Sequence, residues 1–106
     1  MAKYMCIATY TTEGLRGVVK EGGSGRVEAA RKAAESVGGH LDAMYFGFGD
    51  HDVYVICDLP DSKAAAALSL AVGASGGASS KTVVLLTPEE VDKATREVAD
   101  FRAPGG

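Results

Sequence analysis

In some segments of the chain every second residue is apolar, as in a strand, and in others every third or fourth residue is apolar, as in a helix. Alternation rich in β-branched and aromatic residues predicts four strands, over about residues 3–11, 40–48, 53–58 and 81–86. Helical spacing predicts three helices, over about residues 24–37, 62–74 and 88–101. Residues 13–17 are predicted as a loop. A helical turn over 18–21 would be broken by the glycine-rich residues 22–25.

Local signals mark the ends of these helices. Ser24 can cap the first helix, and two consecutive glycines at 38 and 39 stop it. Asp61 follows a proline and can cap the second helix. The third helix has the strongest start, with Thr87 as the cap, proline at the first position and glutamate at the third.

The predicted order is βαββαβ with an additional C-terminal helix, which is an α+β, ferredoxin-like arrangement. Its four strands form one antiparallel sheet, and right-handed crossovers place both main helices on the same face. A length of 106 residues suits a single domain, which we assign to residues 1–102, with residues 103–106 as a frayed tail.

A sheet with helices on one face leaves its other face bare, and the strands are apolar on both faces. Successive side chains of a strand point to opposite faces, and on this basis we assign the large side chains to the bare face: Tyr4, Tyr10, Phe46, Phe48, Tyr54 and Ile56. We assign the smaller ones to the helix-covered face: Ile7, Ala43, Val53, Val55 and Cys57. An aromatic patch of this size exceeds what a monomer normally exposes. We therefore expect a homo-oligomer stacked sheet to sheet, or a ligand cavity there.

Composition and charge exclude several classes. The net charge is −3, the pI is about 5.3, and the basic residues are scattered, so no nucleic-acid partner is expected. The N-terminus lacks a signal-peptide pattern and no apolar run is long enough to cross a bilayer. A cytoplasmic protein without a membrane partner is expected, with Cys6 and Cys57 as buried, reduced thiols.

Four segments in a fixed order resemble the GYD domain family of small bacterial proteins. They are TYTTEGLRG at residues 9–17, GRVEAAR at 25–31, YFGFGDHD at 45–52 and the Pro-Asp helix start at 60–61. The resemblance covers roughly residues 3–90. It implies a ferredoxin-like fold related to dimeric α/β barrels, and it implies no particular activity, because none is established for the family as a class.

The resemblance also implies candidate positions for a site. The naming motif is Gly, any residue, Tyr, Asp, which corresponds here to Gly49 and Asp52 with His51 in place of the tyrosine. Three further family positions correspond to Arg26, Tyr45 and Asp58. The departure at His51 weakens any role for an aromatic hydroxyl at that position.

The residues themselves leave alternatives open at this motif. Gly49 and Asp52 suit a turn in which the aspartate bonds nearby amides. Alternatively, Asp52 could orient the His51 imidazole for proton transfer, although neighbours in a strand point to opposite faces. A haem or metal ligand at His51 is a further alternative. No cofactor is expected, because the only other histidine, His40, lies at the far end of the second strand.

The remaining candidates concern binding. Tyrosines 4, 10, 45 and 54 could turn their hydroxyls toward a small apolar or aromatic ligand, or pack in an interface. Arg26 could pair with Asp58 or bind an anion. The leading hypothesis is a homo-oligomeric module that binds a small molecule, or only itself, between stacked sheets. The alternative is a small dimeric α/β-barrel enzyme, a cofactor-free oxygenase or an isomerase-like protein, with the same pocket.

Overall fold

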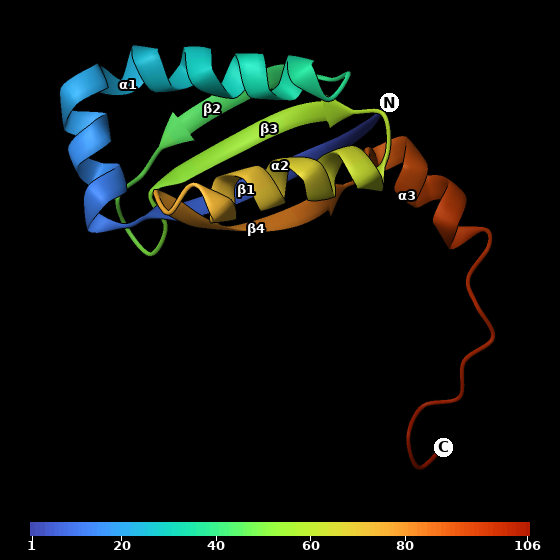
Figure 1. Cartoon of the computed structure of the whole chain (residues 1–106). Helices are drawn as coiled ribbons and strands as arrows, with labels where there is room; N and C mark the ends of the chain where they lie inside the picture. The colour runs from blue at the N-terminus through green and yellow to red at the C-terminus, as the bar shows by residue number, and fades with distance from the viewer.

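The computed structural model describes all 106 residues and contains four strands and three helices (Figure 1). In chain order these are β1 (Ala2–Tyr10), α1 (Thr12–Ser36), β2 (His40–Phe46), β3 (Val53–Leu59), α2 (Ser62–Ala74), β4 (Ala78–Leu85) and α3 (Pro88–Thr95). The predicted βαββαβ order with a C-terminal helix is confirmed.

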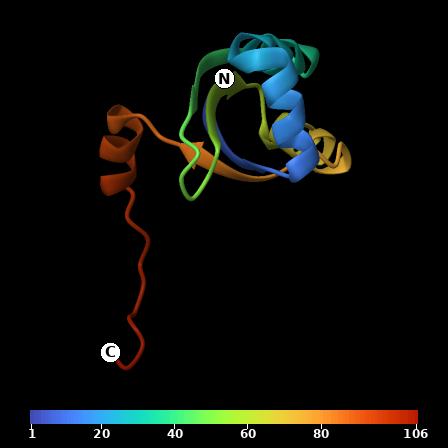
Figure 2. The same ribbon diagram turned by 90° about the vertical axis from the view of Figure 1, so that its left-hand side faces the viewer.

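The strands form one antiparallel sheet in the order β2-β3-β1-β4. Helices α1 and α2 lie on the same face of this curved sheet, whereas α3 projects from its opposite side (Figure 2). The α+β, ferredoxin-like prediction is therefore confirmed for the single chain. No helix combines the length and the apolar character needed to cross a membrane.

Helix α1 begins much earlier than the sequence pattern predicted. Thr11 is its N-cap and accepts a hydrogen bond from the Gly14 amide at 3.1 Å, while the Thr11 amide bonds to the Gly77 carbonyl at 2.9 Å. The prediction of a loop over residues 13–17 is wrong, because this contact with the start of β4 holds the turn in place. The predicted break is present as a kink at Gly22, where φ is 78°.

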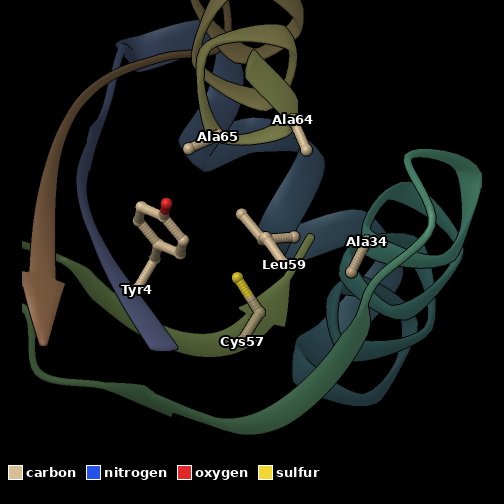
Figure 3. Close-up of a cluster of buried hydrophobic side chains, with 6 residues drawn as sticks. All are labelled: Tyr4, Ala34, Cys57, Leu59, Ala64 and Ala65. Carbon is tan, nitrogen blue, oxygen red and sulfur yellow. The ribbon is translucent and has the colours of Figure 1, made fainter. Parts of the chain in front are cut away.

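The main buried cluster is small and lies where the C-terminal end of α1 meets the start of α2 (Figure 3). Leu59 is its most buried large side chain, at 1% exposed. Around it pack the other members of the cluster: Tyr4, Ala34, Cys57, Ala64 and Ala65. Asp61 caps α2 beside this cluster, as predicted, and accepts a hydrogen bond from the Ala64 amide at 2.9 Å.

The predicted faces of β1 are wrong. β1 pairs with β3 so that Tyr4 lies opposite Cys57 and Cys6 opposite Val55. Directly opposite residues share a face. Tyr4, Cys6, Ala8 and Tyr10 therefore face the helices, and Ile7 lies on the bare face. Alternation separates the two sets of side chains, but only the register with β3 decides which set is covered.

The predicted faces of β2 are wrong as well. A register shift between Leu41 and Ala43, of the kind a β-bulge produces, changes the parity of the strand. Beyond the shift, Ala43 lies opposite Ile56 on the bare face, and Phe46 lies opposite Val53 on the helix face. The bare face carries the following apolar side chains: Met5, Ile7, Ala43, Tyr45, Tyr54, Ile56, Val83 and Leu85. The charged residues Lys3, Asp58 and Lys81 share this face with them.

Candidate functional site

A cavity of about 450 Å³ lies between the middle of the sheet and the helices that cover it. Its floor is formed by side chains of the central strands β1 and β3 and of the edge strand β2: Cys6, Ala8, Met44, Val53 and Val55. Its roof is formed by small side chains of α1 and α2: Ala29, Ala30, Ala33, Ala71 and Val72. The floor and the roof of the cavity are therefore mostly apolar.

The space exists because the two helices lie over opposite edges of the sheet. α1 packs mainly on β2 and α2 mainly on β4, and Figure 2 shows both helices on one side of the sheet. The cavity occupies the gap between the two helices over β1 and β3. Alanine side chains are too short to fill that gap. The alanines of both helices therefore leave room for a ligand.

The charged groups of the cavity all come from α1, between its first turn and the residues that follow its kink. Arg26 and Glu21 lie on either side of Gly22, and an Arg26 Nη1 hydrogen donates to Glu21 Oε2 at 3.5 Å. Glu13, from the first turn of α1, also lines the cavity and forms no ion pair within the chain. A bound molecule would thus meet apolar walls over most of its surface and charged groups at one end.

Cys6 is the one thiol on the cavity floor. Burial raises the pKa of the Cys6 thiol above its ordinary value, and a hydrogen bond to Ser80 opposes this only in part. The protonated thiol is a weak nucleophile, so Cys6 acts here as a small apolar wall. Burial likewise raises the pKa of Cys57, which belongs to the core.

The segment that joins β2 to β3 is tied to β1 through Asp52. The carboxylate Oδ2 of Asp52 accepts a hydrogen bond from the Tyr10 amide at 2.8 Å, and the Asp52 amide donates to the Ala8 carbonyl at 2.9 Å. Within the turn, the Gly49 amide donates to the His51 carbonyl at 3.1 Å. Asp52 therefore extends the β1–β3 pairing past the end of the strands.

The sequence model of the GYD domain matches residues 4–95, most of the chain. The chain belongs to the GYD domain family. No curated protein and no solved structure matched it.

His51 and Asp52, which the sequence suggested as a pair for proton transfer, have separate partners in this GYD domain. His51 Nδ1 lies 3.2 Å from Thr9 Oγ1, and its ring meets the Tyr54 ring edge-on at 6.5 Å. Asp52 and His51 thus each bond to β1 rather than to one another. No three His, Cys, Asp or Glu side chains are grouped so as to hold a metal ion.

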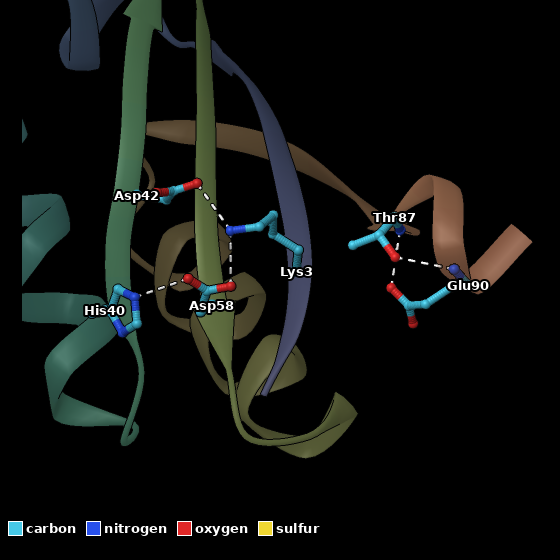
Figure 4. Close-up of polar contacts among 6 residues, drawn as sticks. All are labelled: Lys3, His40, Asp42, Asp58, Thr87 and Glu90. Atoms are coloured by element: carbon cyan, nitrogen blue, oxygen red, sulfur yellow. Dashed lines mark hydrogen bonds and ion pairs between the residues drawn. The ribbon is translucent and has the colours of Figure 1, made fainter.

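The predicted pairing of Arg26 with Asp58 is wrong, because Asp58 pairs with residues of β1 and β2 instead (Figure 4). Asp58 Oδ1 accepts from Lys3 Nζ at 3.0 Å, and Oδ2 lies 2.8 Å from His40 Nε2. Lys3 also donates to Asp42 at 3.0 Å. The hydrogen bond from Lys3 holds the pKa of Asp58 below its ordinary value, and the bonds to Asp42 and Asp58 raise the pKa of Lys3.

The four tyrosines of the GYD domain do not converge on one pocket. Tyr10 lines the cavity, Tyr4 belongs to the core, and Tyr45 and Tyr54 lie on the bare face. Phe46 stacks on Phe48, with ring centroids 5.9 Å apart, at the end of β2.

Sequence reasoning missed most of the cavity. It did not single out Glu13 or Glu21, it considered Cys6 only as a buried, reduced thiol, and it did not include the alanines of α1 and α2 among the candidate residues. The spacing of residues along the first part of α1 did contain a signal for these cavity positions. If α1 is extended back to Thr12, residues 13, 17 and 21 repeat every fourth position and fall on one face.

Proposed function

We propose that this GYD domain is a homo-oligomeric module that binds a small, mostly apolar molecule in the cavity between its sheet and its two covering helices. The observation that carries the proposal is the cavity itself, with apolar walls and charged groups at one end. Ligand sites typically have volumes of about 300–1,000 Å³, apolar linings and a few polar groups that orient the ligand. The volume of about 450 Å³ lies within that range.

Binding is favoured over catalysis by the positions of the reactive groups. His51 and Asp52 lie in the turn just before β3, where each bonds to a residue of β1, and neither residue lines the cavity. Of the groups that do line it, Cys6 is held as a protonated thiol, and Arg26 is occupied by Glu21. These groups suit recognition of a ligand with an aromatic or aliphatic body and one polar end.

Self-association is the second part of the proposal and is supported by the bare face. Met5, Ile7 and Ile56 form its centre, and Tyr45 at its edge is 70% exposed. Covering such a face with the same face of a second copy removes apolar area from water in both subunits. The ligand cavity lies on the other side of the sheet, so each subunit keeps its own site.

A direct test is native mass spectrometry of the protein purified from cells without denaturation. A bound mass in addition to that of the chain supports a resident ligand. The binding site is then located with three probes of similar aromatic size, the neutral indole, the anionic benzoate and the cationic phenethylamine, by thermal shift. A preference for benzoate indicates Arg26 as the orienting group, and a preference for phenethylamine indicates Glu13 or Glu21.

A pair of alanine variants provides the control. Ala30→Leu places a larger side chain in the cavity, whereas Ala66→Leu adds the same atoms on the exposed side of α2. The probe that stabilises the wild-type protein should stabilise Ala66→Leu equally and should lose its effect on Ala30→Leu. Equal stabilisation of both variants would place the probe elsewhere and would contradict the cavity site.

A further inference from the structure

We propose that α3 is an intersubunit arm, which packs against a second copy of the chain in a dimer formed through the bare sheet faces. The inference rests on the self-association proposed above and adds the element that completes the interface. It concerns the last helix and the residues that follow it, which the cavity does not involve.

The first observation is that α3 and the residues that follow it present apolar side chains to solvent. Every residue from Thr87 to the C-terminus is exposed, and Val91, Val98 and Phe101 are 46%, 77% and 78% exposed. The spacing of these residues predicted one continuous helix to Phe101, but the helix ends at Thr95. An isolated helix of this length is marginal in water, and most helices owe their stability to packing of an apolar face.

The second observation is that α3 is built as a helix despite this exposure. Thr87 Oγ1 accepts from the Glu90 amide at 3.1 Å, and the Glu90 carboxylate accepts from the Thr87 amide at 2.9 Å (Figure 4). The hydrogen bond from the Thr87 amide lowers the pKa of Glu90, so the cap is intact at neutral pH. The cap also fixes the direction in which the chain leaves β4, because only Leu86 and Thr87 separate β4 from α3. This short connection points α3 away from its own sheet.

The third observation is continuity between the two exposed surfaces. α3 projects from the same side of the sheet as the bare face (Figure 2). Val83 and Leu85 of β4 lie on the bare face, and the 59% exposed Leu86 leads from them to α3. A second copy that covers the bare face is thereby placed beside α3, and two-fold symmetry makes the contact reciprocal.

The exposed area is sufficient for such an interface. The chain exposes 7174 Å², whereas a compact monomer of 10.9 kDa would expose about 5,600 Å². The excess of about 1,600 Å² is larger than the roughly 800 Å² that each partner contributes to an interface of standard size. The radius of gyration of 16.5 Å also exceeds the roughly 13 Å expected of a compact domain. The projecting segment after β4 contributes to both values (Figure 1), so the surface that an arm would need for docking on a partner is present.

The test uses three full-length glutamate variants, measured by size-exclusion chromatography with light scattering over a range of protein concentrations. Val98→Glu alters the arm, and Tyr45→Glu alters the bare face. Val19→Glu alters a residue of α1 that is 86% exposed on the helix-covered side and serves as the control. Because Val98 and Tyr45 are themselves well exposed, neither variant should prevent folding.

We expect the wild-type protein and Val19→Glu to be dimers with equal dissociation constants, and Val98→Glu and Tyr45→Glu each to raise that constant at least about tenfold. If Tyr45→Glu weakens the dimer and Val98→Glu does not, the proposal of an intersubunit arm is wrong, whereas the proposal of a dimer through the bare faces is supported. If the wild-type protein is monomeric, both proposals fail. A Val98→Glu protein of unchanged mass but lowered Tm would indicate that α3 packs on its own subunit, which also overturns the arm.

Discussion

The carboxylate of Asp52 accepts a hydrogen bond from the backbone amide of Tyr10, with 2.8 Å between the oxygen and the nitrogen. This bond joins the turn after β2 to the last residue of β1, just where the chain enters α1. Tyr10 lines the cavity and Asp52 does not, so Asp52 holds one edge of the candidate site in place from outside.

Replacing Asp52 should therefore reduce stability more when the new side chain has no oxygen to accept the hydrogen bond from the Tyr10 amide. Asp52→Ala removes the acceptor of the Tyr10 amide and should lower the free energy of unfolding by about 1–2 kcal/mol. Asp52→Asn keeps an acceptor oxygen and should cost clearly less. Urea denaturation of both variants measures the difference. Equal losses in the two would contradict the role of this bond.

Gly14 and Gly17 provide a second matched pair, because both lie in the first part of α1. A Cβ atom at Gly14 would overlap the carbonyl oxygen of Gly77, whereas one at Gly17 would meet no atom within 4 Å. Gly14→Ala should destabilise the protein by about 1–3 kcal/mol, as overpacking does. Gly17→Ala should stabilise it by about 0.5–1 kcal/mol, since alanine is the better helix former. Thermal unfolding of the two variants should give Tm shifts of opposite sign.

The Asp58 cluster should make stability depend on acidic pH. The folded-state pKa of Asp58 is lower than the ordinary value of 3.8, so its ion pair contributes stability above that value. The contribution is lost as the pH falls through the lowered pKa. Asp58→Asn should therefore unfold at a slightly lower urea concentration than the wild-type protein near neutral pH. The gap should close as the pH falls below 3.8, and a gap that persists would indicate that packing rather than charge is responsible.

The two cysteines should react slowly with thiol reagents in the folded protein. Burial raises the pKa of both Cys6 and Cys57, so little thiolate is present at neutral pH. Labelling should be at least about tenfold slower than in the unfolded chain. Comparison of Cys6→Ser with Cys57→Ser assigns the rates to each thiol. Rapid labelling of Cys6 would show that the cavity floor is open to solvent and activates the thiol.

Several elements were predictable because their signals are local. The caps at Asp61 and Thr87 and the helix break at Gly22 each depend on residues within one turn of the chain. Alternation within β3 also separated its two faces correctly: Val53, Val55 and Cys57 lie under the helices, and Tyr54 and Ile56 lie on the bare face.

The start of α1 was not predictable in this way. Its first two turns contain glycines at 14 and 17, which are poor helix formers. It is held by hydrogen bonds between Thr11 and residues 76 and 77, more than sixty positions away in the sequence. Local propensity carries no information about such a contact.

The sequence alone determined the number, order and approximate limits of most elements, and with them the α+β ferredoxin-like architecture and the presence of an unpaired apolar sheet face. Tertiary structure alone decided which side chains occupy that face, where the cavity lies and what Asp58 binds. The reason is physical: periodicity and capping act over a few residues. The face that holds Tyr4, the shift at Leu41 and the gap between α1 and α2 depend on how distant strands and helices meet.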